Sequence, residues 1–237
     1  MTSVSKNARV AGLLYIFDSV FGVAYLLYIP NTLIVQGNAA STANNIVTHE
    51  SLFRFGMVSE LLCAALWVFV TLALYRLLKG VDQGLATLMV ILGLMPLPVY
   101  VVNTMTDAAA LLFARGPDFL SVFSEPQRYA FAMLFLNLHD HLVLAYEMLG
   151  APFFVPFGVL VYRSRFLPRI LGVWLMIVCF AYLALGFSGI LFPTYKDRVA
   201  QIAQPVLFGE VAIMLWLVVM GARLRPTEAT ASSSAAG

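Results

Sequence analysis

The chain has 237 residues, of which 61% are hydrophobic and 11% are charged, and its mean hydropathy is +0.89. Soluble domains have about 45–50% apolar and about 25% charged residues, so this composition excludes an ordinary soluble domain. The formal net charge of +2 is too small to indicate nucleic-acid binding. The length leaves room for several membrane spans of about 20 residues each and little room for a soluble domain. The composition therefore predicts an integral membrane protein, with the lipid bilayer as its main partner.

Six hydrophobic segments are long enough to be transmembrane helices. They cover about residues 9–29, 53–78, 84–113, 128–162, 168–192 and 200–221. We therefore predict an all-α polytopic transmembrane helix bundle of six spans, forming one membrane domain over residues 9–221. Residues 1–8 then form a short cytoplasmic segment. The last residues are rich in Ala, Ser and Thr, and we expect 222–237 to be a disordered cytoplasmic tail.

The distribution of Lys and Arg between the loops predicts that both termini are cytoplasmic. In that orientation the inner side carries nine basic residues and the outer side carries five. The inner nine are Lys6, Arg9, Arg76, Lys79, Arg163, Arg165, Arg169, Arg223 and Arg225. The outer five are Arg54, Arg115, Arg128, Lys196 and Arg198.

Local signals refine the boundaries of these helices. Ser124, Glu125 and Pro126 indicate a helix start, with a capping Ser and a Pro in the first turn. The outer loop over 30–52 contains a stretch, 39–46, that favours one short surface helix. We expect breaks in the third and fourth segments at the prolines, because each Pro frees a backbone carbonyl. These prolines are Pro96, Pro98, Pro152 and Pro156. Broken helices that line a midplane cavity are typical of transporters; an ordinary kink is the alternative.

Six carboxylates inside the hydrophobic segments are the main functional signal. They are Asp18, Glu60, Asp107, Asp140, Glu147 and Glu210. A charged side chain at the bilayer centre costs about 2.5–3.5 kcal/mol on insertion scales, so six of them predict a polar cavity, reached from the outside. Helical spacing adds Asn103 to the face of Asp107, and His141 to the face of Asp140. The candidate cavity or ligand residues are therefore these six acids with Asn103, His139 and His141, and Arg54 is the candidate at the entrance.

Structural alternatives exist for several of these residues. Asp18, Glu60 and Glu210 could be neutral and hydrogen-bonded between helices, which would only fix their packing. Asp107 could be an interfacial helix cap, and Arg54 an anchor at the outer edge.

The first two helices resemble the last two in a weak parallel repeat, which aligns Glu60 with Glu210. If the repeat is real, the two carboxylates lie at equivalent depth and could face each other.

The run His139-Asp140-His141 is the only local motif that suggests metal binding, and we expect no metal there. Residues at i and i+2 diverge on a helix, so both His cannot easily bind one ion. Zinc sites need three or four ligands, and the chain has no H-E-x-x-H motif. No phosphate-binding loop or cysteine motif is present, and we expect no cofactor.

Five segments carry a resemblance to a known family. They are residues 9–15, 50–61, 135–139, 166–173 and 209–210, of which 166–173 is the most specific. Over about residues 9–221 the chain resembles the bacterial integral-membrane family catalogued as domain of unknown function 4386. The resemblance implies a multi-pass protein of the bacterial cytoplasmic membrane with no assigned activity.

The resemblance also ranks the candidate residues. Arg54, Glu60, His139 and Glu210 lie at positions that match the family. Asp140, His141 and Glu147 do not match it, and Phe153 stands where the family usually has a His. A function shared by the family would therefore depend on Glu60, Glu210 and His139 more than on the acids of the fourth segment, which argues further against a metal site there.

Three hypotheses of function remain open at this point. The first is a membrane protein that binds or transports a small molecule or lipid, with Glu60 and Glu210 in its cavity. The second is an intramembrane enzyme that uses His139 or His141 for acid–base chemistry with a carboxylate. The third is a structural or partner-binding subunit with paired acids. The sequence identifies neither a catalytic residue nor an oligomeric state.

Overall fold

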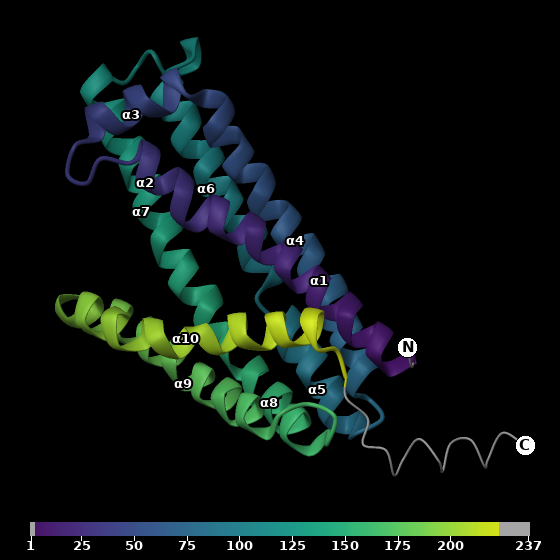
Figure 1. The fold of residues 1–237 in the computed structure, drawn as a ribbon. Helices are drawn as coiled ribbons and strands as arrows, with labels where there is room; N and C mark the ends of the chain where they lie inside the picture. The colour runs from purple at the N-terminus through teal and green to yellow at the C-terminus, as the bar shows by residue number, and fades with distance from the viewer. Residues whose placement is uncertain (1–2, 223–237) are drawn as a thin grey trace, which may run out of the picture. The chain divides into compact units, whose positions relative to one another are not determined.

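The computed structural model describes residues 3–222, and within this range the chain is helical and has no β-strand. The long helices are α1 (Ser3–Val23), α4 (Glu50–Leu78), α5 (Gln83–Leu94), α6 (Leu97–Arg115), α7 (Glu125–Gly150), α8 (Phe154–Arg163), α9 (Arg169–Leu191) and α10 (Lys196–Val219) (Figure 1). The shorter elements are the π-helical η1 (Ala24–Tyr28), α2 (Ile29–Leu33), α3 (Ala39–Thr48) and the 3-10 turns η2 (Asp118–Leu120), η3 (Ala151–Phe153) and η4 (Pro193–Tyr195).

Six helical stretches are long and apolar enough to cross a membrane, which confirms the predicted all-α, six-span architecture. They are Val4–Leu33, Glu50–Leu78, Gln83–Arg115, Glu125–Arg163, Arg169–Leu191 and Pro193–Val219. Large apolar side chains on them point outward; Phe17, Phe180 and Phe208 are 62%, 67% and 61% exposed. Such exposure is unfavourable in water and is what a lipid-facing surface requires. The predicted tail over 222–237 lies, apart from Ala222, outside the described residues.

The helix breaks follow the prolines, as predicted. The third span divides between α5 and α6 at Met95 and Pro96, and the fourth divides between α7 and α8 at the 3-10 turn that contains Pro152. Pro98 and Pro156 lie just after these breaks, in the first turns of α6 and α8, where a missing backbone N–H costs little.

The predicted start of α7 is also confirmed. Ser124 precedes its first residue, and both the backbone N–H and the Oγ of Ser124 donate to Gln127 Oε1, at 2.9 and 3.1 Å. This is the reach-back half of a capping box. The short helix expected near 39–46 is α3, whose N-cap Asn38 accepts a hydrogen bond from the backbone N–H of Ser41.

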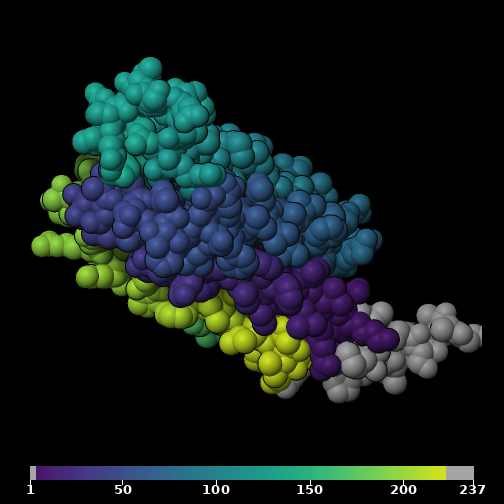
Figure 2. All heavy atoms as spheres, turned by 90° about the horizontal axis from the view of Figure 1, so that it is seen from above, coloured from purple at the N-terminus to yellow at the C-terminus, as the bar shows by residue number. Residues whose placement is uncertain are grey.

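Contacts divide the chain into two compact units, each of which is described by itself. Of the described residues, unit 1 comprises 3–16, 68–95 and 148–222, and unit 2 comprises 17–67 and 96–147. In unit 2, α3 packs against α6, and the blue and teal atoms of these segments lie side by side in Figure 2. The core of unit 2 contains Ile29, Leu33, Ile46, Phe53, Leu111 and Leu136.

Unit 1 is built on close contacts between α8, α9 and α10. At the crossing of α8 and α9 the backbones nearly touch: a Cβ on Gly172 would lie 2.6 Å from the carbonyl oxygen of Gly158. Gly209 on α10 makes room for Trp174 of α9, whose Nε1 donates to the carbonyl oxygen of Val206 at 2.8 Å. Small residues at helix crossings are how helices pack closely in a membrane.

We expect Gly172→Ala to destabilise the protein by about 1–3 kcal/mol, because its methyl group has no space between α8 and α9. The matched control is Gly22→Ala in α1, where the nearest atom to the new Cβ is Cys63 Sγ at 3.9 Å. The control should be neutral or slightly stabilising. Unfolding of the two variants by denaturant in mixed micelles measures the difference. Equal midpoints would show that α8 and α9 do not approach as closely as described.

Candidate functional site

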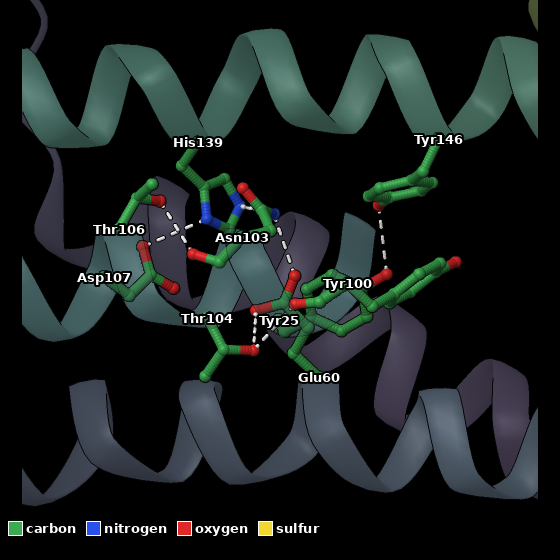
Figure 3. A network of polar contacts seen from close by, with 9 residues as sticks. All are labelled: Tyr25, Glu60, Tyr100, Asn103, Thr104, Thr106, Asp107, His139 and Tyr146. Carbon is green, nitrogen blue, oxygen red and sulfur yellow. Dashed lines mark hydrogen bonds and ion pairs between the residues drawn. The ribbon is translucent and has the colours of Figure 1, made fainter. Parts of the chain in front are cut away.

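Glu60 is the centre of a buried polar cluster in unit 2. It lies on α4 and is fully buried. Its Oε1 accepts a hydrogen bond from Asn103 Nδ2 and its Oε2 accepts one from Thr104 Oγ1, both at 2.8 Å (Figure 3). Because both donors lie on α6, the carboxyl group connects α4 to α6 at two points.

A histidine and a second acid complete the cluster. His139, on α7, has its Nδ1 3.0 Å from Asp107 Oδ1 of α6, and its Nε2 lies 3.4 Å from Asn103 Nδ2. Both His139 and Asp107 are only 9% exposed. Figure 3 shows the Asn103 amide between the imidazole ring and the carboxyl group of Glu60. Three helices, α4, α6 and α7, therefore supply the cluster.

The local structure of α6 positions two of these side chains. Asn103 and Asp107 are four residues apart and lie on one face of the helix. Thr106 Oγ1 donates to the Asn103 carbonyl oxygen of the same helix at 2.7 Å. The Thr104 hydroxyl has a single proton and lies 2.8 Å from Glu60 Oε2 and 3.1 Å from the Tyr100 carbonyl oxygen. These contacts hold the two threonine hydroxyls close to the backbone of α6.

Aromatic side chains close one side of the cluster (Figure 3). Tyr25 lies in the π-helical η1, and its hydroxyl is 3.0 Å from that of Tyr146 on α7. The rings of Tyr146 and Tyr100 are stacked, with centroids 4.2 Å apart. Single π-helical turns within α-helices are often found at functional sites. Here the π-helical turn belongs to the first span, and its residue Tyr25 contacts Tyr146 of α7.

A pocket in unit 2 leads to the cluster. Its walls are largely apolar, and Asp107, His139 and Asp140 are its acidic and imidazole groups. The apolar wall consists of Ile29, Pro30, Leu33, Ile34, Phe53 and Leu136. The cavity volume is about 30 Å³, and a water needs about 10–15 Å³. The pocket thus has room for a small ion or roughly two waters beside His139.

Two features set the electrostatics of the cluster. Among the residues that the structure describes, neither Glu60 nor Asp107 pairs with a Lys or an Arg; the ion pairs of Arg side chains go to Glu50 and Asp82. Two acids and one imidazole therefore leave an excess of negative charge when both acids are ionised. Within the same range, Asn103 Oδ1 is buried and accepts no hydrogen bond, although buried polar atoms almost always have a partner.

Glu210 is held in a different way, in unit 1. Its Oε2 accepts from the Tyr15 hydroxyl at 2.7 Å and its Oε1 accepts from the Tyr182 hydroxyl at 2.6 Å. The repeat had raised the expectation that Glu60 and Glu210 face each other. The two carboxyl groups belong to different units, and the expectation stays a prediction.

The other candidate residues lie outside the hydrogen-bonded cluster. Asp18 is buried, and Cys63 Sγ lies 3.3 Å from its Oδ1. Asp140 is exposed at the pocket, and Glu147 is half-buried. His141 is exposed, with Nδ1 2.8 Å from the Asn137 carbonyl oxygen.

Arg54 pairs with Glu50 at 2.7 Å on the exposed first turns of α4, and Glu50 also contacts Arg115 at 3.4 Å. This surface pairing fits the anchor alternative for Arg54 better than a role at the pocket, whose lining does not include it.

Sequence reasoning missed Thr104 and Tyr146. Thr104 follows Asn103 directly, so grouping by intervals of three and four residues assigns the two to different faces. Asn103 and Thr104 nevertheless both reach Glu60, because each donates to a different oxygen of its carboxyl group. Tyr146 had no signal, since Tyr residues in membrane helices are common.

The six apolar helices and the buried cluster define a class: a multi-pass helical membrane protein with a polar cluster buried inside one of its units. The chain belongs to the family described as Domain of unknown function (DUF4386), whose model matches residues 10–221 and confirms the resemblance seen in the sequence. No curated protein and no solved structure matches the chain.

We expect Thr104→Val to destabilise the protein by about 1–3 kcal/mol, because it removes a donor from a fully buried carboxyl oxygen. Thr87→Val is the matched control: Thr87 is exposed on α5 and its hydroxyl donates only to the Gln83 carbonyl oxygen of the same helix. The control should change stability by less than about 0.5 kcal/mol. Denaturant unfolding in micelles measures both, and an equally small effect at both positions would contradict the role given to Thr104.

Proposed function

We propose that this protein is a multi-pass protein of the bacterial cytoplasmic membrane that binds a small, positively charged ligand at Glu60, Asp107 and His139. The observation that carries the proposal is the pair of buried acids without a Lys or Arg partner in the described chain. Buried negative charge is stable only when it is neutralised by a proton or a cation. A cationic ligand would supply that charge.

The pocket favours ligand binding over a purely structural role. A carboxyl group that only fixes packing needs donors and no access, and Glu210 with its two tyrosine hydroxyls is of that kind. Asp107 and His139 instead form part of a pocket wall. The pocket gives a small cation a route to the acids, and its apolar walls favour a ligand or an ion that sheds most of its water.

A cationic ligand should stabilise the wild type, by about 2.7 kcal/mol at a concentration one hundred times its Kd. The probes are a panel of inorganic cations and short alkylammonium ions, with thermal unfolding of the detergent-extracted protein as the readout. Native mass spectrometry of the same extracts would identify any cation that co-purifies. We expect the stabilisation to disappear in Glu60→Gln and in Asp107→Asn, because each removes one negative charge from the cluster.

Glu210→Gln is the matched control, since it makes the same change at a buried acid of unit 1. It should keep the response of the wild type. If every cation acts equally on wild type, Glu60→Gln and Glu210→Gln, the acids only fix packing, and the protein is better described as a structural or partner-binding subunit.

One observation favours an enzyme as the second candidate. A His–carboxylate pair in a cavity is the minimum for acid–base catalysis, and His139 and Asp107 form one, with 3.0 Å between Nδ1 and Oδ1. Asp107 would orient the imidazole, and a water in the pocket would be the reacting partner. Conversion of a co-purifying molecule by wild type but not by His139→Gln would select this candidate.

We infer further that both termini are cytoplasmic, which is supported by the excess of Lys and Arg on one side. Cysteines introduced at Gln36, in the loop before α3, and at Gly80, in the loop before α5, test it; both positions are exposed. Cys63 and Cys179 are buried and should give little background. A membrane-impermeant maleimide should label position 36 in intact spheroplasts, and position 80 only after permeabilisation. The reverse pattern would invert the topology.

A further inference from the structure

We propose that Glu60, Asp107 and His139 bind one divalent first-row transition-metal ion such as Zn²⁺, Mn²⁺ or Co²⁺. The inference rests on the proposed function and names its ligand. The sequence could not indicate such a site, because its three ligands come from three different helices and form no local motif. The proposed site also differs from the His139-Asp140-His141 run, because His141 is exposed and its Nδ1 lies within hydrogen-bond distance of the Asn137 carbonyl oxygen on the same helix.

The geometry supports a three-ligand site. One nitrogen of His139 and one oxygen each of Glu60 and Asp107 all lie within 4.8 Å of one another. A metal ion with bonds of about 2.0–2.2 Å holds neighbouring ligand atoms about 3–4 Å apart. Small side-chain rotations are therefore enough to bring the three atoms onto one ion.

The donor set selects the class of metal. One imidazole nitrogen and two carboxylate oxygens suit Zn²⁺, Mn²⁺, Fe²⁺ and Co²⁺, whereas Ca²⁺ takes six to eight oxygen ligands and Cu⁺ prefers sulfur. Charge gives a second reason. A dication with two carboxylates and a neutral imidazole is neutral overall, and a neutral complex is what a helix bundle in lipid can bury at lowest cost.

Asn103 supplies an independent observation. It is fully buried and its Nδ2 donates to Glu60 Oε1, while its Oδ1 accepts no hydrogen bond from any described residue. A metal-bound imidazole keeps its proton on the other nitrogen and donates it to a nearby oxygen. If the metal binds at Nδ1 of His139, the proton is on Nε2, which lies 3.4 Å from the Asn103 amide. Rotation of that amide by half a turn would present Oδ1 to it. The same rotation would remove the Asn103 hydrogen bond from Glu60 Oε1, which would then be free to bind the metal.

The pocket makes the site an open one. Three protein ligands leave at least one coordination position for water or substrate, as in catalytic rather than structural zinc sites. Asp107 and His139 line a cavity of about 30 Å³, which is room for roughly two waters. The metal would therefore hold water on the pocket side and be fixed by Glu60 on the other.

Titration of the metal-free full-length protein with Co²⁺ tests the proposal. The protein is purified in mild detergent on a tag without histidine and treated with a chelator. We expect one Co²⁺ per chain, with visible absorption bands of a mixed nitrogen–oxygen site, and displacement by Zn²⁺. His139→Gln, Glu60→Gln and Asp107→Asn should each weaken binding at least about tenfold. His141→Gln, two residues away on α7, and His49→Gln are matched controls that should bind as wild type does.

A metal-dependent rise in unfolding temperature guards against variants that are merely unstable, because it compares each variant with itself. It should appear in wild type and in both control variants, and be absent in the three ligand variants. No Co²⁺ bound to wild type, or equal binding by wild type and His139→Gln, would overturn the metal site. If no metal site is found but alkylammonium ions still stabilise wild type and not Glu60→Gln, the proposed cation site stands without a metal. If alkylammonium ions do not stabilise wild type either, the cation site and the metal site are both wrong.

Discussion

The structure of unit 2 depends on the need to satisfy a buried carboxyl group. Glu60 is fully buried, and its two oxygens take their hydrogen bonds from adjacent residues of another helix, Asn103 and Thr104. Inside a bilayer no water can replace these donors, so a slip of α4 against α6 by one residue would leave the carboxyl group without them. The bonds therefore fix the register of the two helices. Through Asn103 and Asp107, the same face of α6 then determines where His139 of α7 lies.

The segments that carry the family resemblance divide into those that pack helices and those that form the site. The most specific, 166–173, ends the turn after α8 and begins α9, and its Gly172 allows α9 to touch α8. Gly209 likewise admits the Trp174 ring. By contrast, the segments 50–61 and 135–139 contain Glu60 and His139, which meet in the cluster. The resemblance therefore covers both residues that allow close helix packing and residues of the buried cluster.

Hydropathy and proline positions predict this fold well, because lipid acts on each helix separately. A span of apolar residues must be helical to satisfy its backbone. A proline removes one backbone donor whatever its neighbours are, although Pro205 lies inside the continuous helix α10. The site is different, because its contacts depend on how helices face one another. The acids and Asn103 were identifiable as polar residues on apolar helices. The donor Thr104, the Tyr25–Tyr146 contact and the π-helical turn were not, since each depends on the position of a second helix.

The two glutamates that the sequence aligned have different surroundings. Glu210 takes a phenol hydroxyl on each oxygen, and Phe154 stacks on one of those phenols, the ring of Tyr182. Phenols donate hydrogen bonds and carry no charge, so this arrangement gives both carboxyl oxygens of Glu210 a donor without adding a charged partner. Glu60 also has two donors, but a second acid and an imidazole lie within reach of it, at the end of a pocket. Two ionised acids near one imidazole need a proton or a cation to neutralise them, and the pocket would give a cation access to them. Access, rather than the number of buried acids, is therefore the property on which the proposed binding at the cluster depends.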